Sequence, residues 1–169
     1  MLSLYVSLPL LTVLALIQDV VLTRISIGGG QFDVVLVAVI AWGLLRGPAE
    51  GMIWAFIGGL VLDLFSGGPM GGITLALLIV AFLAGQQWGS ELGLAYIQLI
   101  LLTLVLSFLY HMLLLVVLGW RGYPVNWVYS LPRVAAPSAA LNAVLAPLVY
   151  RPLIWLDRRT RPEGLTFDA

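Results

Sequence analysis

The chain has 169 residues, of which 62% are hydrophobic and only 9% are charged. A soluble globular domain carries about 25% charged residues, which cover its surface. The 8 acidic and 8 basic side chains of this chain are too few to cover a domain of its size. We therefore expect most of its surface to face lipid instead of water.

Missing residue types exclude several kinds of functional site. The chain has no cysteine and a single histidine, which excludes disulfides, thiolate metal sites and multi-histidine metal sites. All the basic residues are arginine, which excludes a Schiff-base lysine and a Walker A phosphate loop. The formal net charge of zero gives no reason to expect a nucleic-acid partner. We expect no metal, no cofactor and no nucleic-acid ligand.

Apolar runs divide nearly the whole chain into candidate membrane helices. A helix needs about 20 mainly apolar residues to cross about 30 Å of hydrocarbon. The first run has no preceding basic residue and no clear cleavage site, so we interpret it as a retained span and not a signal peptide. The predicted spans are residues 2–22, 32–46, 49–65, 73–88, 92–118 and 134–156. They predict an all-α, polytopic membrane domain with six transmembrane helices, residues 1–156, and a short polar cytoplasmic tail, residues 157–169.

The interruptions between the runs have recognisable signatures. Pro48 fits the first turn of the third helix, where a missing amide hydrogen does no harm. The segment from Ser66 to Gly72 contains four glycines and one proline, which predicts a tight turn before the fourth span. The segment from Gly119 to Arg133 mixes Trp, Tyr and Arg, and such residues prefer the membrane interface.

The distribution of arginine predicts the orientation of the chain. With six spans, Arg46 and the three arginines of the tail fall on the side of the N-terminus, whereas three other arginines fall on the opposite side. The side of a membrane protein that is richer in Lys and Arg is usually cytoplasmic. We therefore expect both termini in the cytoplasm.

A carboxylate at the end of a stripe of small residues is the first candidate site. Gly51, Ala55, Gly59 and Asp63 are spaced by four and lie on one face of the third helix. Stripes of small residues allow membrane helices to approach closely. Three roles remain open for Asp63: an intramolecular seam in which it caps or hydrogen-bonds the following glycine loop, a proton relay or substrate ligand, and a contact for a partner.

The fifth and sixth spans carry further polar side chains. Ser107 and His111 lie one helical turn apart, as do Ser138 and Asn142, so each pair can form hydrogen bonds to a neighbouring helix. We interpret all four residues as packing contacts and not as metal ligands. The single pair of ionisable groups that we can propose for chemistry within the membrane is Asp63 with His111.

Other charged residues lie near the ends of the predicted spans. We expect water to reach Asp19 and Asp33 there. Arg46 and Glu50 are four residues apart, which predicts a local salt bridge of little energetic value.

Three segments resemble the rod shape-determining protein MreD family. They are Asp33-Val34-Val35, the stretch from Arg46 to Gly51, and the stretch from Gly58 to Gly71. The most specific part is the Gly-x3-Asp-x5-Pro-x-Gly pattern from Gly59 to Gly71, and the length and hydropathy extend the resemblance over nearly the whole chain. It adds the turn residues Gly67, Pro69 and Gly71 to the residues that we expect to pack helices or bind a partner.

The resemblance implies a function without catalysis. Members of the family are multi-pass proteins of the bacterial inner membrane and belong to the elongasome, which directs cell shape and lateral peptidoglycan synthesis. It implies MreC as the direct partner, and MreB, RodA and PBP2 as members of the larger complex. The family's fold is similar to that of the S-components of energy-coupling-factor vitamin transporters. The small-residue stripe and the glycine loop would form a groove for the partner's single helix.

Two other functions remain open. A substrate-binding S-component would enclose a vitamin-sized molecule within a similar bundle of helices. An intramembrane enzyme that acts on lipid-linked wall precursors would need at least two convergent ionisable groups in a polar pocket.

Overall fold

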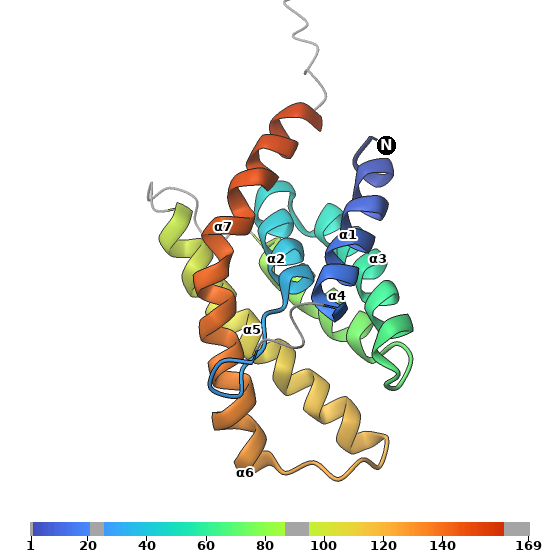
Figure 1. The fold of residues 1–169 in the computed structure, drawn as a ribbon. Coiled ribbons are helices and arrows are strands. Elements are labelled where there is room, and N and C mark those ends of the chain that lie inside the picture. Colours follow the sequence, from blue (N-terminus) through green and yellow to red (C-terminus); the bar gives the residue numbers. More distant parts are fainter. Residues whose placement is uncertain (1, 21–25, 87–94, 161–169) are drawn as a thin grey trace, which may run out of the picture.

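The structure is a computed structural model that describes residues 2–20, 26–86 and 95–160, with side chains from residue 8 onwards (Figure 1). The described residues are almost entirely helical, and they contain no β-strand apart from one isolated bridge between Ile27 and Gly30. The helices are α1 (Leu2–Val20), α2 (Val34–Arg46), α3 (Pro48–Ser66), α4 (Gly72–Ala84), α5 (Ala95–Trp120), α6 (Trp127–Ser130), the π-helical turn η3 (Leu131–Ala135) and α7 (Ala136–Thr160).

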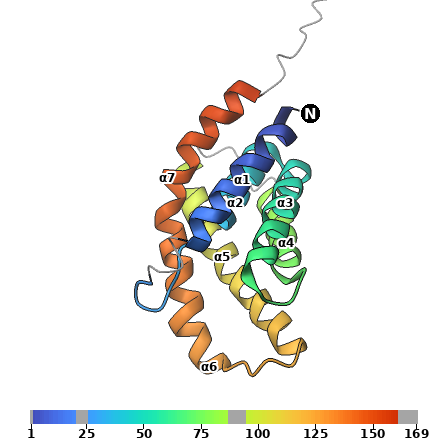
Figure 2. The same ribbon diagram turned by 45° about the vertical axis from the view of Figure 1, so that its right-hand side comes forward.

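Helix α2 lies at the centre of the bundle. It contacts α1, α3, α4, α5 and α7, and every residue from Val35 to Gly43 is buried. A helix that is apolar on all sides is stable only where other helices surround it, which explains its continuous run of Val, Leu, Ile and Ala. The beginning of α1 and the end of α7 lie at one end of the bundle, and α6 and the glycine-rich turn lie at the other (Figures 1 and 2).

Three of the helices are long and apolar enough to cross a membrane. They are α3, α5 from Tyr96, and the continuous helical segment Trp127–Thr160. The other predicted spans are shorter apolar helices: Leu8–Val20 within α1, together with α2 and α4. The structure thus confirms the all-helical character and the apolar helices, while by length it supports three of the six predicted crossings.

Two boundaries differ from the sequence-based expectation. The last span was expected to begin at residue 134, but helical structure already begins at Trp127, where the Asn126 side chain accepts a hydrogen bond from the Tyr129 amide. Helix α7 also continues to Thr160, past the expected start of the tail at Asp157. Asp157 is buried because it binds Arg46 at the end of α2, and this contact holds the last turn of α7 against the bundle.

The turn between α3 and α4 depends on glycine. Gly67 and Gly71 have positive φ angles of 62° and 87°, a region of backbone conformation that side chains disfavour. Gly67 ends α3 in the left-handed conformation typical of helix C-termini, and Pro48 opens the same helix as expected. The turn brings α4 back along α3 within a few residues.

The small-residue stripe of α3 faces the interior of the protein. A Cβ atom at Gly59 would lie 2.6 Å from the Thr74 Cα of α4, and one at Gly51 would lie 2.9 Å from the Gly43 Cα of α2. Ala55, between these glycines, and Asp63, one turn beyond Gly59, are also buried. Of the two roles expected for this stripe, helix packing is the one that α2 and α4 fill, and a partner helix could use the stripe as a groove only by displacing them.

We expect Gly59→Ala to destabilise the protein, because the added methyl group overlaps the backbone of α4 at Thr74. Overpacking of this kind costs about 1–3 kcal/mol of unfolding free energy. Thermal unfolding of the purified protein in detergent measures the effect. Gly68→Ala is the matched control, since its Cβ would lie 3.5 Å from the Ser66 Oγ. Equal stability of the two variants would contradict the close contact between α3 and α4.

Candidate functional site

Polar side chains from three helices meet Asp33 at the N-terminal end of α2. They are Gln18 of α1, Ser107 and His111 of α5, and Asn142 of α7, and we call these five residues the buried polar cluster. The side chains of His111 and Asp33 are 13% and 16% exposed, and Ser107 and Asn142 are fully buried. The cluster is the point at which α1, α2, α5 and α7 are joined by polar contacts.

Hydrogen bonds close the cluster around the start of α2. Asn142 accepts from the Asp33 amide at 2.8 Å through its Oδ1 and donates to the Ser107 Oγ at 2.7 Å through its Nδ2. Gln18 donates to the Asp33 Oδ1 at 3.1 Å and accepts from the Val35 amide at 3.0 Å. The free amides at the start of a helix need acceptors. Here neighbouring helices supply them, because the Asp33 side chain does not cap α2 itself.

Both ring nitrogens of His111 face oxygen atoms. Its Nδ1 lies 2.8 Å from the Ser107 carbonyl oxygen, and its Nε2 lies 3.3 Å from the Asp33 Oδ2. A carbonyl oxygen only accepts hydrogen bonds, so Nδ1 is the donor in the first contact. When Nε2 also carries a proton, the second contact is an ion pair in which the imidazolium charge offsets the carboxylate, which suits an apolar surrounding.

Ser138 extends the same polar contacts along α7. Its hydroxyl accepts a hydrogen bond of 2.9 Å from the Gln31 amide. The backbone at Gly30 passes so close to Pro137 that a Cβ atom there would lie 2.8 Å from the Pro137 Cβ. The segment before α2 is therefore held against α7 along its length.

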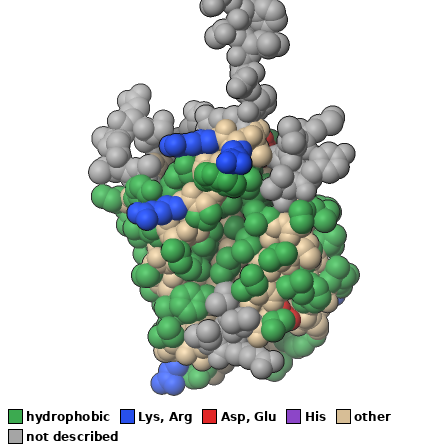
Figure 3. All heavy atoms as spheres, turned by 45° about the horizontal axis from the view of Figure 1, so that its top comes forward, with side chains coloured by type: hydrophobic (Ala, Val, Ile, Leu, Met, Phe, Trp, Pro, Cys, Tyr) green, Lys and Arg blue, Asp and Glu red, His purple; other side chains and the backbone are tan. Residues whose placement is uncertain are grey.

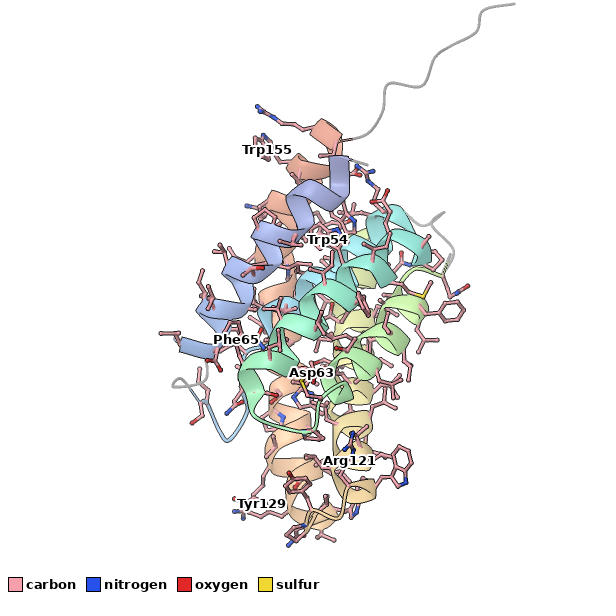
Figure 4. All side chains as sticks on the ribbon, turned by 90° about the vertical axis from the view of Figure 1, so that its right-hand side faces the viewer. Trp54, Asp63, Phe65, Arg121, Tyr129 and Trp155 are labelled. Carbon is pink, nitrogen blue, oxygen red and sulfur yellow. The ribbon has the colours of Figure 1, made fainter. Side chains whose placement is uncertain are left out.

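Asp63 forms a second polar site, between α3 and α4. Its carboxylate accepts hydrogen bonds of 3.0 Å from the Ile73 and Thr74 amides and one of 2.5 Å from the Thr74 hydroxyl. These amides belong to the first turn of α4, so Asp63 supplies from another helix the cap that Gly71 cannot provide. A negative charge at this position also interacts favourably with the α4 dipole. Figure 4 shows Asp63 where the end of α3 faces the start of α4.

Arg46 organises a third polar site at the opposite end of α2. It binds the Asp157 carboxylate, donates to the Asp157 carbonyl oxygen at 3.1 Å and to the Thr160 hydroxyl at 2.6 Å. The structure confirms the expected local salt bridge to Glu50, at 3.3 Å, and Arg46 also ties α2 to α7 through Asp157, a contact that the sequence did not predict. Arg46 lies 5.2 Å from the Trp42 ring, which stacks on Trp54.

The sequence identified most members of the cluster but not their pairing. Asp33 was expected in contact with water at a span end, whereas its carboxylate lies against Gln18 and His111. His111 therefore pairs with Asp33 and not with Asp63, whose oxygens are bound to α4. Gln18 was not selected as a site residue. Its position as the first amide in an apolar span was the available signal.

The arrangement supports helix packing more directly than chemistry. The hydrogen-bonding atoms of Asp33 and His111 are engaged by Gln18 and Ser107 as well as by each other. Across the described ranges, no three His, Cys, Asp or Glu side chains are grouped so that they could hold a metal ion. What the site does physically is to fix the relative positions of four helices.

Comparison with known proteins gives one match. The family model described as rod shape-determining protein MreD matches residues 2–158 of the chain. Neither the curated proteins nor the solved structures include a significant match.

We expect Asp63→Ala to lower the stability of the protein, because it leaves the Ile73 and Thr74 amides without their acceptor. Loss of a helix cap costs about 0.5–2 kcal/mol of unfolding free energy. Asp63→Asn keeps one carbonyl oxygen and should retain part of this stability. Unfolding in detergent distinguishes the two, and a loss in Asp63→Asn as large as that in Asp63→Ala would argue against capping as the role of the side chain.

We expect Asp33 and His111 to be energetically coupled, because their side chains are in direct contact. A double-mutant cycle with Asp33→Asn and His111→Phe should give a coupling of about 0.6–1.7 kcal/mol, the range for interhelical hydrogen bonds in membranes. Asp33→Asn combined with Asp157→Asn is the control, since these residues lie in separate clusters at opposite ends of α2. That pair should be additive. Additivity in both cycles would mean that the contact contributes nothing.

Proposed function

The chain belongs to the rod shape-determining protein MreD family, and we propose that it acts as the multi-pass membrane scaffold to which an MreC-like single-span protein binds. Membership of the family implies a role in rod shape determination. The match over residues 2–158 carries this conclusion, since it covers α1 to α6 and η3 in full and all but the last two residues of α7. Through MreC, the scaffold would join MreB, RodA and PBP2 in the elongasome and support lateral peptidoglycan synthesis.

A structural role agrees with the way the polar groups are used. Members of the MreD family are shape-determining structural membrane proteins and are not known as enzymes. Asp33 and His111 do converge, yet their hydrogen bonds are made within the protein and join α2 to α5. The comparisons give no support to the alternative function, a vitamin-binding S-component.

The bundle crosses the inner membrane six times in this proposal. The three shorter helices would cross the membrane while packed against longer neighbours. Helix α2, for example, packs against α3 and α7. Four described arginines belong to the end that holds the end of α7: Arg151, Arg158 and Arg159 lie in the C-terminal part of α7, and Arg46 binds Asp157 there. Arg121 follows α5 and Arg133 lies in η3, next to α6 at the other end (Figure 1). This excess supports cytoplasmic termini.

The outward face of α5 is the docking surface that we assign to the partner helix. Ile97, Leu101, Leu104 and Phe108 are exposed, and their spacing of four, three and four repeats the pattern of helices that pack at a shallow angle. Of the three long helices, α5 is the least covered by its own protein, with 22% of its apolar window buried. A single helix running along this stripe would cover apolar side chains without displacing a helix of the bundle.

Co-purification with an MreC-like protein from native membranes in mild detergent tests this proposal. Leu101→Trp should reduce recovery of the partner about tenfold, which corresponds to about 1.4 kcal/mol of binding free energy. Leu60→Trp is the matched control, because Leu60 is also exposed but lies on α3. It should leave recovery unchanged. Loss with Leu60→Trp alone would move the surface to α3, and absence of the partner from the wild-type preparation would overturn the function.

Gly59→Leu distinguishes the interior seam from the partner surface. Gly59 packs against Thr74 inside the protein, so this variant should unfold at lower temperature before any specific effect on binding. A stable Gly59→Leu protein that had lost its partner would instead restore the small-residue stripe as the docking groove.

A further inference from the structure

One face of the end of α7 is basic and aromatic. Arg151, Trp155, Arg158 and Arg159 are all exposed, and their spacing of four, three and one places them within a narrow arc of the helix. We call these four residues the α7 basic face. Figure 4 shows Trp155 at the end of the molecule opposite Arg121 and Tyr129. Figure 3 shows hydrophobic side chains over the middle of the visible surface and arginine or lysine side chains towards its ends.

The described carboxylates nearest to the α7 basic face are engaged elsewhere. Asp157 lies between Trp155 and Arg158 in sequence, but its side chain is buried and binds Arg46. Glu50 binds the same arginine and the Trp42 ring nitrogen. Within the described part of the chain, the ion pairs leave Arg151, Arg158 and Arg159 without an acidic partner. This end of α7 therefore presents positive charge outwards.

Trp155 places this charge at the depth of lipid headgroups. The Arg159 guanidinium lies 4.2 Å from the centre of the Trp155 ring, a distance typical of a cation–π contact. Tryptophan is enriched where hydrocarbon meets headgroups, because one part of its ring system is apolar and the other can hydrogen-bond. Arginine side chains near a helix end extend towards the same layer. Guanidinium groups also match phosphate oxygens in charge and geometry.

We propose that the α7 basic face binds the phosphate headgroups of anionic phospholipids in the adjacent leaflet. The two ends of the molecule would then differ in lipid preference, since at the other end Arg133 lies in η3 and Arg121 lies in the turn after α5, so these two arginines do not share one helix face. Bound lipid would fix the depth of α7 and, through Asp157 and Arg46, the position of α2. This inference does not depend on binding of an MreC-like partner.

Native mass spectrometry of the full chain released from detergent tests the proposal, with phosphatidylglycerol and phosphatidylcholine added separately. The wild-type protein should retain more phosphatidylglycerol than phosphatidylcholine, and less of it as salt increases. The double variant Arg158→Gln/Arg159→Gln should bind phosphatidylglycerol about fivefold more weakly per arginine, or about 1 kcal/mol each. The charge-conserving variant Arg158→Lys/Arg159→Lys should retain most of the binding.

Arg121→Gln/Arg133→Gln is the matched control, because it removes the same charge from the opposite end. It should keep the preference for phosphatidylglycerol. Equal retention of the two lipids by the wild-type protein, or equal loss in both glutamine variants, would overturn the proposal. A third arm adds a polyprenyl phosphate, and retention of that lipid without phosphatidylglycerol would also overturn it. Thermal unfolding of each variant verifies that differences in lipid binding do not arise from loss of the fold.

Discussion

A central helix that is shorter than the membrane must find protein partners for the groups at its ends. Helix α2 has 13 residues, whereas a full crossing needs about 20. At its start, Gln18 and Asn142 accept the amide hydrogens of Val35 and Asp33. At its end, Arg46 is held by side chains of α3 and α7. Apolar surroundings offer no other acceptors, so these contacts determine where α2 lies.

The start of α4 also needs protein partners for its backbone groups, and α3 supplies them in a different way. Here glycines permit close approach of the backbones, and a carboxylate from one helix satisfies the first amides of the next. The small and polar residues therefore make their contacts inside the bundle. The large apolar side chains remain outside, for example Phe56 on α3 and Leu101 on α5. An interior joined by hydrogen bonds and an apolar exterior suit the scaffold role that we propose for the protein.

The ends of the bundle carry the features that relate it to the membrane surface. A cation–π contact lies at each end. Arg159 contacts the Trp155 ring at one end, and Arg133 contacts the Tyr129 ring at the other. The helical segment from Trp127 to Thr160 is long enough to reach both ends by itself. Asp157 joins the C-terminal end of this segment to Arg46 and so to the central helix α2.

The sequence by itself determined the membrane character, the helical architecture, the glycine turn and the identity of most polar residues. These properties are local, since composition, periodicity and glycine chemistry act within one helix or turn. Only the tertiary structure decided the pairing of polar groups and the direction of the small-residue stripe. Arg46 and Asp157 are 111 residues apart, and Asp33 and Asn142 are 109 apart. Helical spacing defines the face on which a residue lies, but it contains no information about which helix covers that face.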